Sequence, residues 1–462
     1  MSPLSFSTLA LSPDIQKNLS TLGYHEMTPI QAQSLPAILQ LRDLIAQAKT
    51  GSGKTAAFGI GLLQKLNPTW FAVQALVVCP TRELADQVSN ELRRLARFTE
   101  NVKVLTLCGG TPMRPQIASL EHGAHIIVGT PGRIRDHIGR ATIDLSKVQT
   151  LVLDEADRMV DMGFYEDIAG IASACNVRRQ TLLFSATYPD DIRKISAEFL
   201  RDPVEIKVES QHDDAQIEQR FYEVGYDDRN AAVARMLNHF RPTSTLAFCN
   251  TKIHCRELAE ELRAQGFSAL ALYGELEQRE RDEILVLFAN RSCSVLVATD
   301  VAARGLDIQS LNAVINVDVS KDTEVHIHRI GRTGRNNQDK GLALSLCAPN
   351  EKKWVKLIED YQQRPAQWFD LAELEPADGG MLAAPMVTLC IMGGKKDKLR
   401  PGDLLGALTG EAGLTKEQVG KINVFEFMTY VALERSVAQK AYARLNNGNI
   451  KGRNFRMRFI EI

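Results

Sequence analysis

Residues 48–55 read AKTGSGKT and stand between the apolar run LIAQ and the helical stretch AAFGIGLLQKL. Where a glycine-rich turn leads from a strand into a helix, backbone N–H groups and the positive end of the helix bind phosphate oxygens. The pattern predicts that Lys54 contacts the β- and γ-phosphates of a nucleotide and that the Thr55 hydroxyl binds Mg²⁺. The nucleotide-binding residues predicted in this turn are Thr50, Gly51, Ser52, Gly53, Lys54 and Thr55.

Two adjacent acids, Asp154 and Glu155, follow the apolar run LVL at 151–153. Ligands of open α/β sheets bind at the carboxyl ends of the strands, where these side chains would lie. We expect Asp154 to bind Mg²⁺ and Glu155 to orient or deprotonate an attacking water. Adjacent acids at a strand end can also be a simple polar cap, but the phosphate-binding turn upstream favours the catalytic interpretation.

The elements that must hold these residues are indicated by short apolar runs, among them ALVVCP, HIIVGT, TLVLDEAD and TLLFSAT. Stretches of helical periodicity separate them. Strands that are apolar throughout and alternate with helices predict a parallel sheet covered on both faces. After a polar, acidic stretch at 208–219, the pattern restarts with TLAFCN, SALALYG, VLVATD and AVINVD. We therefore predict two tandem α/β domains, at 1–207 and 220–372, joined by a linker at 208–219.

The last part of the chain has a different order of elements. A boundary containing Pro and Gly, at 373–384, separates it from the second α/β domain. Residues 385–462 then follow the order β-α-β-β-α-β, which predicts a split βαβ domain of the α+β class. This segment carries thirteen Lys or Arg against seven Asp or Glu, a net charge of +6, whereas the rest of the chain has a net charge of −7. A basic domain on an acidic body predicts a polyanion-binding module, although a solvated basic face is the alternative.

Composition limits the class of protein. The apolar content of 44% and the charged content of 24% are ordinary for a globular chain of 462 residues. The eight cysteines form no CxxC pair, which predicts buried free thiols in a reducing compartment and neither disulfides nor zinc. The N-terminal sequence has no signal-peptide pattern, and no stretch approaches the ~20 apolar residues of a membrane span. We expect a cytoplasmic protein.

Several further motifs complete the pattern. Thr55 and the run DEAD at 154–157 occur together with SAT at 185–187 and HRIGRTGR at 328–335. These motifs closely resemble those of the DEAD-box RNA helicases. The runs GYHEMTPIQ, PTRELA, TPGR and ATDVAARGLDI occur in the family's order and extend the resemblance over about residues 1–370. The resemblance implies two RecA-like domains that close on ATP, Mg²⁺ and single-stranded RNA.

The resemblance also implies roles for residues of the first domain. Gln31 would hydrogen-bond the adenine edge, Thr28 would contact the nucleotide, and Tyr24 or Phe6 would cover the base. Either aromatic could instead be a core side chain. Ser185 and Thr187 would couple ATP-driven closure to strand separation, although at a strand end they could simply satisfy local backbone groups.

In the second domain, the resemblance implies that Arg332 and Arg335 are arginine fingers on the γ-phosphate. Asp307 would reach the ribose, and Gly305 would lie in the same motif. Because the fingers come from a different domain than Lys54, hydrolysis should require closure of the two domains. An Arg-rich loop without this resemblance is more often a solvated face.

A track for RNA follows from loops that come after the predicted strands. Glycines allow the RNA backbone to approach closely and Arg or Thr can donate to phosphates, so binding should be indifferent to sequence. The residues predicted for this track are Arg82, Gly109, Gly110, Thr130, Gly132 and Arg133 in the first domain, and Asn250, Gln278, Arg281 and Thr299 in the second, with Gly305 beside them. Tyr273 and Glu275 depart from the family's usual His and Asp.

The C-terminal segment resembles an RNA-recognition module but lacks its aromatic signature. Its third strand, TYVALE, offers Tyr430 and no R-G-F-G-F run, so base stacking on the sheet face is not supported. The basic residues predicted to bind RNA are Lys395, Lys396, Lys398, Arg400, Lys451 and Arg453. GGKKDKLRPGDLLGALTG and IKGRNFRMR resemble the tail domain of one bacterial branch of the family, which implies a grip on a hairpin of 23S ribosomal RNA. The alternative is a packing domain with a solvated basic rim.

The sequence therefore predicts an ATP-dependent RNA helicase that acts in assembly of the large ribosomal subunit. Tethering to one hairpin would give a sequence-indifferent motor its target by raising the effective concentration of nearby duplexes. One rival is an ATP-controlled RNA clamp that unwinds little, and Glu155, Arg332 and Arg335 favour turnover over it. A DNA helicase is a weaker rival. We expect a monomer by default.

Overall fold

A computed structural model of the chain describes residues 4–48, 51–188, 190–208, 217–303, 311–334, 340–378, 382–450, 452–460 and 462. Thr50, Gly305, Asp307, Arg335 and Lys451, which were predicted to bind nucleotide or RNA, lie outside these residues. The chain forms two compact units, one made of residues up to 211 and one made of most of the remainder.

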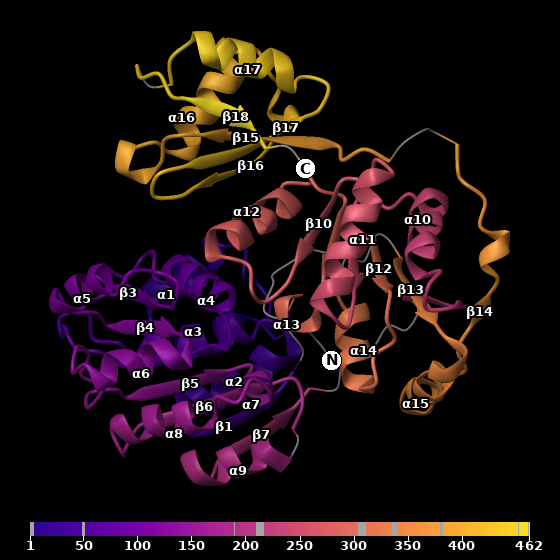
Figure 1. The fold of residues 1–462 in the computed structure, drawn as a ribbon. Helices are drawn as coiled ribbons and strands as arrows, with labels where there is room; N and C mark the ends of the chain where they lie inside the picture. Colours follow the sequence, from indigo (N-terminus) through magenta and orange to yellow (C-terminus); the bar gives the residue numbers. More distant parts are fainter. Residues whose placement is uncertain are drawn as a thin grey trace. The chain divides into compact units, whose positions relative to one another are not determined.

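The first unit is built on a parallel sheet in the order β3-β4-β2-β5-β6-β1-β7, seven strands in the described part of the chain (Figure 1). The strands are β1 (Leu44–Gln47), β2 (Ala75–Val78), β3 (Val104–Leu107), β4 (Ile126–Gly129), β5 (Thr150–Asp154), β6 (Gln180–Ser185) and β7 (Val204–Lys207). The helices are α1 (Pro13–Thr21), α2 (Pro29–Leu39), α3 (Lys54–Lys65), α4 (Arg82–Leu95), α5 (Met113–Glu121), α6 (Pro131–Gly139), α7 (Ala156–Asp161), α8 (Tyr165–Ala174) and α9 (Asp190–Phe199), with a short 3₁₀ turn η1 (Phe6–Thr8) before them.

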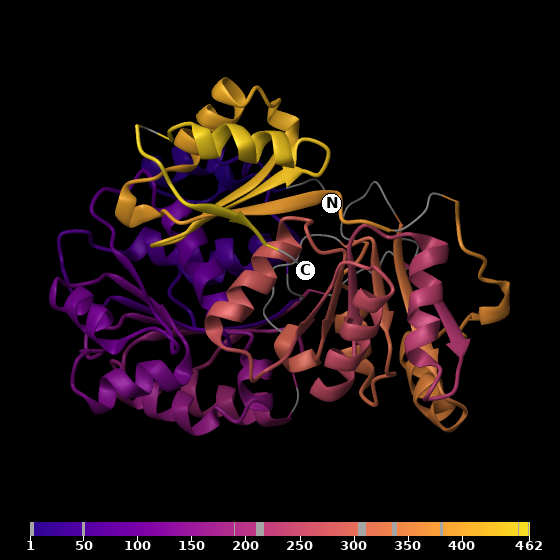
Figure 2. The same ribbon diagram turned by 45° about the horizontal axis from the view of Figure 1, so that its top comes forward.

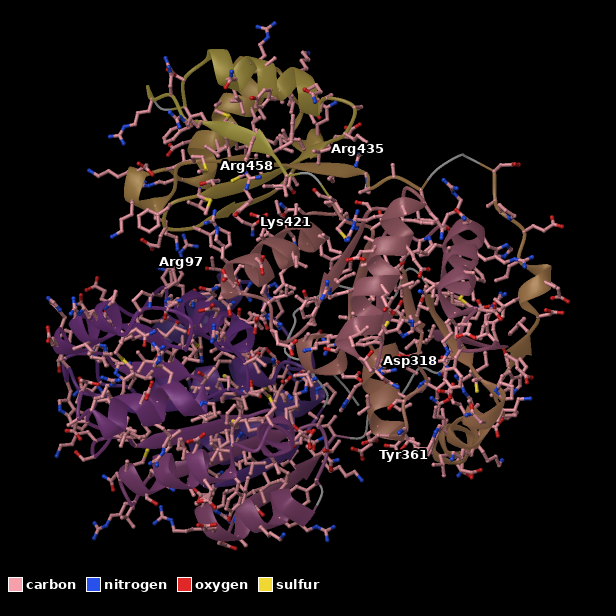
Figure 3. All side chains as sticks on the ribbon, in the orientation of Figure 1. Arg97, Asp318, Tyr361, Lys421, Arg435 and Arg458 are labelled. Atoms are coloured by element: carbon pink, nitrogen blue, oxygen red, sulfur yellow. The ribbon has the colours of Figure 1, made fainter. Side chains whose placement is uncertain are left out.

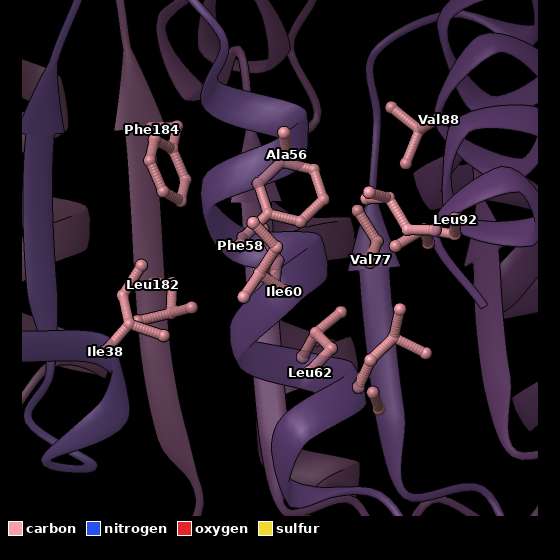
Figure 4. Close-up of a cluster of buried hydrophobic side chains, with 14 of the residues drawn as sticks. Ile38, Ala56, Phe58, Ile60, Leu62, Val77, Val88, Leu92, Leu182 and Phe184 are labelled. Carbon is pink, nitrogen blue, oxygen red and sulfur yellow. The ribbon is translucent and has the colours of Figure 1, made fainter. Parts of the chain in front are cut away.

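Alternate strand residues of this sheet enter two separate hydrophobic clusters. Val77, Val152 and Phe184 pack into the cluster that contains α3 and α4, and their neighbours Leu76 and Leu153 pack into the other. Figure 4 shows the first cluster, in which Phe58 of α3 lies 5.4 Å from Phe184, ring centroid to ring centroid. Both faces of the sheet are therefore covered, which explains why its central strands are apolar at every position.

The second unit contains a sheet of the same kind, in the order β10-β11-β9-β12-β13-β8-β14 among the described residues. The strands are β8 (Ile217–Glu223), β9 (Thr245–Phe248), β10 (Ala269–Leu272), β11 (Val295–Ala298), β12 (Ala313–Asn316), β13 (Gly341–Cys347) and β14 (Trp368–Phe369). The helices are α10 (Arg229–Phe240), α11 (Lys252–Ala264), α12 (Gln278–Ala289), α13 (Asp300–Ala303), α14 (Thr323–Ile330) and α15 (Lys352–Gln362), with 3₁₀ turns η2 (Pro349–Glu351) and η3 (Leu371–Glu373).

The C-terminal part of this unit is a small antiparallel sheet in the order β16-β17-β15-β18. Its elements are β15 (Met386–Ile391), η4 (Lys395–Asp397), α16 (Pro401–Gly406), the π-helical turn η5 (Ala407–Glu411), η6 (Lys416–Gln418), β16 (Val419–Val424), β17 (Thr429–Glu434), α17 (Ala438–Asn447) and β18 (Met457–Phe459). The helices cover one face of the sheet, because Leu404, Leu408 and Leu445 share a core with Leu389 and Val431 (Figure 2). The predicted fold class, two tandem RecA-like parallel-sheet domains plus a split βαβ domain, is confirmed.

Two local features differ from the predicted linkers, and the last strand of the chain is short. Residues 217–219 of the predicted linker belong to β8, and Leu374 and Leu382 of the second predicted linker are buried in the core of the second unit. The final strand is short, since β18 holds Met457–Phe459 only.

The eight cysteines are buried free thiols, as predicted, and burial raises the pKa of the Cys108 thiol to about 12. Among the described residues, no helix is both long and apolar enough to cross a membrane.

Candidate nucleotide-binding and RNA-binding sites

The glycine-rich turn that is predicted to bind phosphate lies between the end of β1 and the start of α3. Gly51 and Gly53 have φ of 84° and 97°, in the left-handed region that glycine adopts without strain. A Cβ on Gly53 would lie 2.5 Å from Nε2 of Gln31, so the Gln31 side chain would have to shift to admit it. Lys54 is buried at the first position of α3, and its Nζ donates to the Ala48 carbonyl at 3.2 Å. Ser52 and Thr55 are partly buried in the same turn.

Gln31 contacts this turn directly. Its Nε2 donates to the Gly53 carbonyl at 3.1 Å, and its Oε1 accepts from the Thr28 backbone N–H at 2.9 Å. The structure thus brings Thr28 and Gln31 against the glycine-rich turn, although they precede Gly53 by 25 and 22 residues. Phe6 is only 4% exposed and meets Tyr24 edge-on, with ring centroids 6.1 Å apart.

Asp154 ends β5 and is 2% exposed. Burial raises its pKa to about 6; the nearby charge of Lys54 opposes this increase, and Glu155 adds to it. Its Oδ1 atom is buried and has no hydrogen-bond partner among the described residues. A buried carboxylate oxygen without a partner is costly, and a hard divalent cation with oxygen ligands is the kind of group that would satisfy it. The donor set of Asp154 and Thr55 therefore fits Mg²⁺.

Glu155 follows with a left-handed backbone, at φ 55° and ψ 51°. This conformation costs a non-glycine residue about 1–3 kcal/mol, and such strain clusters at functional sites. The side chain is 3% exposed, and its Oε2 accepts from Nη1 of Arg158 at 2.6 Å. The strained backbone and this ion pair fix the Glu155 carboxylate beside Asp154.

The DEAD and SAT motifs are joined by Asp157. Its Oδ2 accepts from the backbone N–H groups of Ala186 and Thr187, at 3.0 and 2.9 Å, and from the Thr187 hydroxyl at 3.1 Å. The Asp157 N–H donates to the Ser185 hydroxyl at 3.3 Å. Burial alone would raise the pKa of Asp157, but the Thr187 N–H and the charges of Lys54 and Arg158 outweigh burial and lower it. Ser185 and Thr187 thus form a network with the acidic motif.

The predicted RNA-binding residues of the first unit follow three strands that are neighbours in the sheet, β3, β4 and β2. Arg82 begins α4 and lies over the glycine pair, since a Cβ on Gly110 would fall 1.7 Å from its Nη1 and a Cβ on Gly109 would fall 3.1 Å from its Nη2. Arg133 of α6 donates to the Thr111 carbonyl at 3.0 Å. Thr130 precedes α6, and Gly132 lies in its first turn, where an added Cβ would meet open space. One edge of the sheet therefore gathers these residues.

The same arrangement recurs in the second unit, at the ends of β9 and β11. Asn250 follows β9, and its N–H donates to Asp318 Oδ2 at 2.7 Å. Thr299 follows β11. Gln278 and Arg281 lie in the first turns of α12, where Arg281 Nη2 donates to the Ala302 carbonyl at 2.7 Å. Arg332 is 5% exposed in the loop after α14. Glu275 forms an exposed ion pair with Lys252, and Tyr273 lies just after β10.

The basic residues of the C-terminal domain occupy exposed loops. Lys395, Lys396, Lys398 and Arg400 are exposed in and after the turn η4. Arg453 is also exposed, and its Nη1 donates to the Asp397 carbonyl at 3.3 Å, so it lies against the same turn. Lys421 of β16 and Arg458 of β18 place further positive charge on the two edge strands (Figure 3).

The face of the C-terminal sheet opposite its helices is covered by residues of the helicase part of the same unit. The Thr388 hydroxyl is fully buried, with Ser292 Oγ at 2.7 Å and Asn290 Nδ2 at 3.2 Å. The Tyr430 hydroxyl donates to Glu283 of α12 at 3.2 Å. Tyr430, the aromatic of the third strand, is 5% exposed and therefore offers no open surface for a nucleobase.

Known protein families match the parts of the chain that carry these residues. Residues 28–195 match the DEAD/DEAH box helicase family, and residues 228–337 match the helicase conserved C-terminal domain. The ATP-dependent RNA helicase DbpA of Escherichia coli (strain K12) is 52% identical over 460 residues, which cover 99% of this chain and 100% of that protein. The chain belongs to the DEAD-box RNA helicases. This helicase is therefore an ATP-dependent enzyme that acts on RNA.

Other relatives and solved structures cover the two helicase domains. The DEAD-box ATP-dependent RNA helicase CshA of Geobacillus kaustophilus is 46% identical over 81% of this helicase and 80% of its own length. The structure of Dbp5 of S. cerevisiae bound to RNA and ADP BeF3 matches with a TM-score of 0.72 and 28% identity, over 79% of this chain and 96% of Dbp5. Mss116p bound to single-stranded RNA and AMP-PNP matches with a TM-score of 0.71 and 27% identity, over 82% of this chain and 81% of that one. Residues 388–459 match the DbpA RNA binding domain, so the C-terminal domain of this helicase is an RNA-binding domain.

Two buried residues of this helicase make contacts that its sequence motifs do not indicate. Asp157 stands in the run DEAD and Arg329 in HRIGRTGR, and neither has a predicted role of its own. Arg329 donates through Nε and Nη2 to the two carboxylate oxygens of Asp300, each at 2.7 Å. Its Nη1 donates to the Asp318 carbonyl at 2.6 Å, and its Nη2 also donates to Asn250 Oδ1 at 3.2 Å. It therefore links three loops that follow different strands. The sequence signal for Arg329 was its place in the same motif, three residues before Arg332. An arginine in a helix is mostly exposed unless it is paired.

Proposed function

We propose that this helicase hydrolyses ATP to unwind or remodel short RNA duplexes beside a hairpin of 23S ribosomal RNA that its C-terminal domain holds. This activity would serve assembly of the large ribosomal subunit. The observation that carries the proposal is the combination, in one chain, of a nucleotide-binding unit with a buried, unpartnered Asp154 oxygen and an RNA-binding domain with an exposed basic turn.

The nucleotide half of the proposal rests on the turn at 51–55 and on the acids at the end of β5, Asp154 and Glu155. Lys54 contacts the β- and γ-phosphates, while Thr55 and Asp154 hold Mg²⁺, which when bound neutralises phosphate charge. Glu155 orients the attacking water or accepts its proton, from a carboxylate that Arg158 already fixes. Arg332 and Arg335 stabilise the charge that develops on the γ-phosphate.

The base and sugar of ATP are assigned to residues around the same turn. Gln31, which already contacts Gly53, recognises the adenine edge, and Thr28 contacts the nucleotide beside it. Tyr24 is the better candidate to cover the base, because it is partly exposed whereas Phe6 is a core side chain. Asp307 is assigned to the ribose.

The helicase part of the chain binds the RNA backbone without reading its sequence. Support comes from the arginine, threonine and glycine residues that lie together at one edge of the first sheet, and from Asn250 and Thr299, which follow β9 and β11 of the second. Such groups donate to phosphates and admit a close backbone approach, and they carry no information about bases. Ser185 and Thr187, through Asp157, couple this track to the nucleotide site.

The C-terminal domain directs the helicase to its RNA target. Its exposed basic turn presents Lys395, Lys396, Lys398 and Arg400 to phosphates of a folded RNA, and Arg453 lies beside them.

A duplex-displacement assay with ATP and with a non-hydrolysable analogue tests the enzyme activity. Binding to 23S fragments tests the targeting by the C-terminal domain, with the variant K395A/K396A/K398A/R400A as the matched comparison. Displacement that needs no hydrolysis, or 23S binding that survives this variant, would overturn the corresponding half of the proposal.

A further inference from the structure

Two phenylalanines project from the C-terminal domain into solvent. Phe425 and Phe427 occupy the turn between β16 and β17 and are 40% and 68% exposed. The turn is closed by the Phe425 N–H, which donates to the Met428 carbonyl at 2.8 Å. Phenylalanine has no polar group to gain from water, so an exposed pair on a tight turn marks a contact surface.

This aromatic turn is bonded to the basic turn through the backbone. The Lys395 N–H donates to the Phe425 carbonyl at 2.8 Å, and the Lys396 N–H donates to the Glu426 carbonyl at 3.0 Å. The contact is so close that a Cβ on Gly394 would lie 2.3 Å from the Phe425 oxygen. Gly394 is therefore required by close approach, although its φ of −147° suits any residue.

Both turns are fixed before any ligand arrives. The Phe425 ring meets Tyr430 edge-on at 5.7 Å, and the Gly394 N–H donates to Asp397 Oδ2 at 3.0 Å. Gly393 packs against Phe455 at a distance that leaves no room for a Cβ, which would fall 2.3 Å from the ring. A surface held in this way loses little conformational entropy on binding.

The charges around the aromatic turn favour an anionic ligand. Lys395, Lys396, Lys398, Arg400 and Arg453 are exposed there. The acids nearby are Asp397 and Asp403, whose carboxylates accept backbone N–H groups of the same loop, and Glu426, which is exposed between the two phenylalanines. Cations therefore outnumber acids. Proteins bind single-stranded nucleic acid by combining aromatic side chains, which stack on bases, with cations that lie along the phosphate backbone.

We propose that Phe427, supported by Phe425, stacks an unpaired RNA base whose flanking phosphates contact the basic turn. This inference deepens the proposed function, on which it rests, by naming the ligand of the C-terminal domain as a loop nucleotide and not a paired stem. A base inside a duplex has no free face to offer, whereas an unpaired loop base can be splayed out and stacked. Selection of a hairpin over a plain duplex then requires no hydrogen bond to a base edge.

The test uses the full-length protein and two labelled RNAs. One is a hairpin with an unpaired loop, and the other is the same stem as a blunt-ended duplex. We expect Phe427→Ala to weaken hairpin binding about tenfold, the range of one lost base–aromatic stack, and to leave duplex binding unchanged. Phe427→Trp should retain hairpin binding. Phe71→Ala, at another exposed phenylalanine on the first unit, is the matched control and should change neither.

A second readout places the base directly. 2-Aminopurine at one loop position should be quenched on binding to the wild-type protein and should regain fluorescence with Phe427→Ala. Equal affinity of wild type and Phe427→Ala for the hairpin would overturn the inference and point to a protein-docking turn instead. Loss of both RNAs by Phe427→Ala with an unchanged melting temperature would also overturn it. If K395A/K396A/K398A/R400A binds the hairpin as wild type does, the proposed function fails for this domain, and the inference fails with it.

Discussion

Arg158 Nη1 lies 2.6 Å from Glu155 Oε2, and both side chains are almost completely buried at the start of α7. The Glu155 backbone at this position is left-handed, a conformation that is strained for a residue other than glycine. A buried ion pair is poor evidence for stability by itself, because desolvation offsets attraction. Placed directly after Asp154, which carries the unpartnered oxygen, it is good evidence for a carboxylate held ready for use.

Glu155→Gln should bind ATP and RNA like the wild type but hydrolyse ATP about 10²–10⁴-fold more slowly, because the amide cannot accept a proton. Steady-state ATPase with saturating RNA, alongside equilibrium binding of a nucleotide analogue, checks this. Glu166→Gln, at an exposed acid in the first turn of α8, is the matched control and should retain activity. Turnover near that of the wild type would remove Glu155 from the reaction.

Arg158→Ala should destabilise the first unit by about 3–5 kcal/mol, because it leaves the Glu155 carboxylate buried without this counter-charge. Urea unfolding measures the loss. The double variant Glu155→Gln/Arg158→Ala should recover much of it, since no charge is then stranded. If the two single effects simply add, the pair is not coupled and Arg158 does not position Glu155.

Asp154→Asn should stabilise the protein in the absence of nucleotide and Mg²⁺ at neutral pH. Since the folded-state pKa is raised to about 6 from 3.8, the wild-type folded state holds its proton more tightly than the unfolded state. Wild-type stability is therefore lost as pH rises from about 3.8 to about 6, by about 3 kcal/mol. Unfolding at pH 5 and pH 8 should show the variant gaining on the wild type at the higher pH. A pH-independent difference would contradict the assigned shift.

Thr388→Val should weaken the attachment of the C-terminal sheet to the helicase part of its unit. The valine fills the same space, but Asn290 and Ser292 lose a buried partner, which costs about 1–3 kcal/mol. Hydrogen exchange of β15 amides should become faster relative to the amides of β12. Thr429→Val, at another buried threonine of the same sheet, is the comparison that loses only a bond inside the domain, from its hydroxyl to the Gly393 carbonyl.

Much of this organisation could be predicted from local sequence. Apolar runs such as LVVC and LVLD gave the strands, because a strand covered on both faces is apolar throughout. Glycines and adjacent acids marked the predicted nucleotide site, because a backbone φ above zero favours glycine and metal binding favours carboxylates. The C-terminal order of elements followed from its alternation of periodicities.

Other parts depend on contacts between distant segments, which no local pattern carries. Asp157 joins Thr187, thirty residues away, and nothing in the run DEAD says which acid points toward SAT. Thr388 looks like any strand threonine until Asn290 and Ser292 bury it. Phe425 and Phe427 alternate like core residues in a final stretch of strand, yet the strand ends at Val424 and leaves both on a turn.

The central claim is that the C-terminal basic turn gives a sequence-indifferent ATPase its RNA target. The most direct test compares ATPase stimulation by a 23S fragment that contains the hairpin with stimulation by poly(U). Neutralisation at 395, 396, 398 and 400 is preferable to deletion of 385–462, because deletion would also uncover Asn290 and Ser292. The wild type should respond at lower concentrations of the 23S fragment than of poly(U), and K395A/K396A/K398A/R400A should lose that preference while keeping its response to poly(U). A preference that survives the four substitutions, or a wild type without one, would contradict the account.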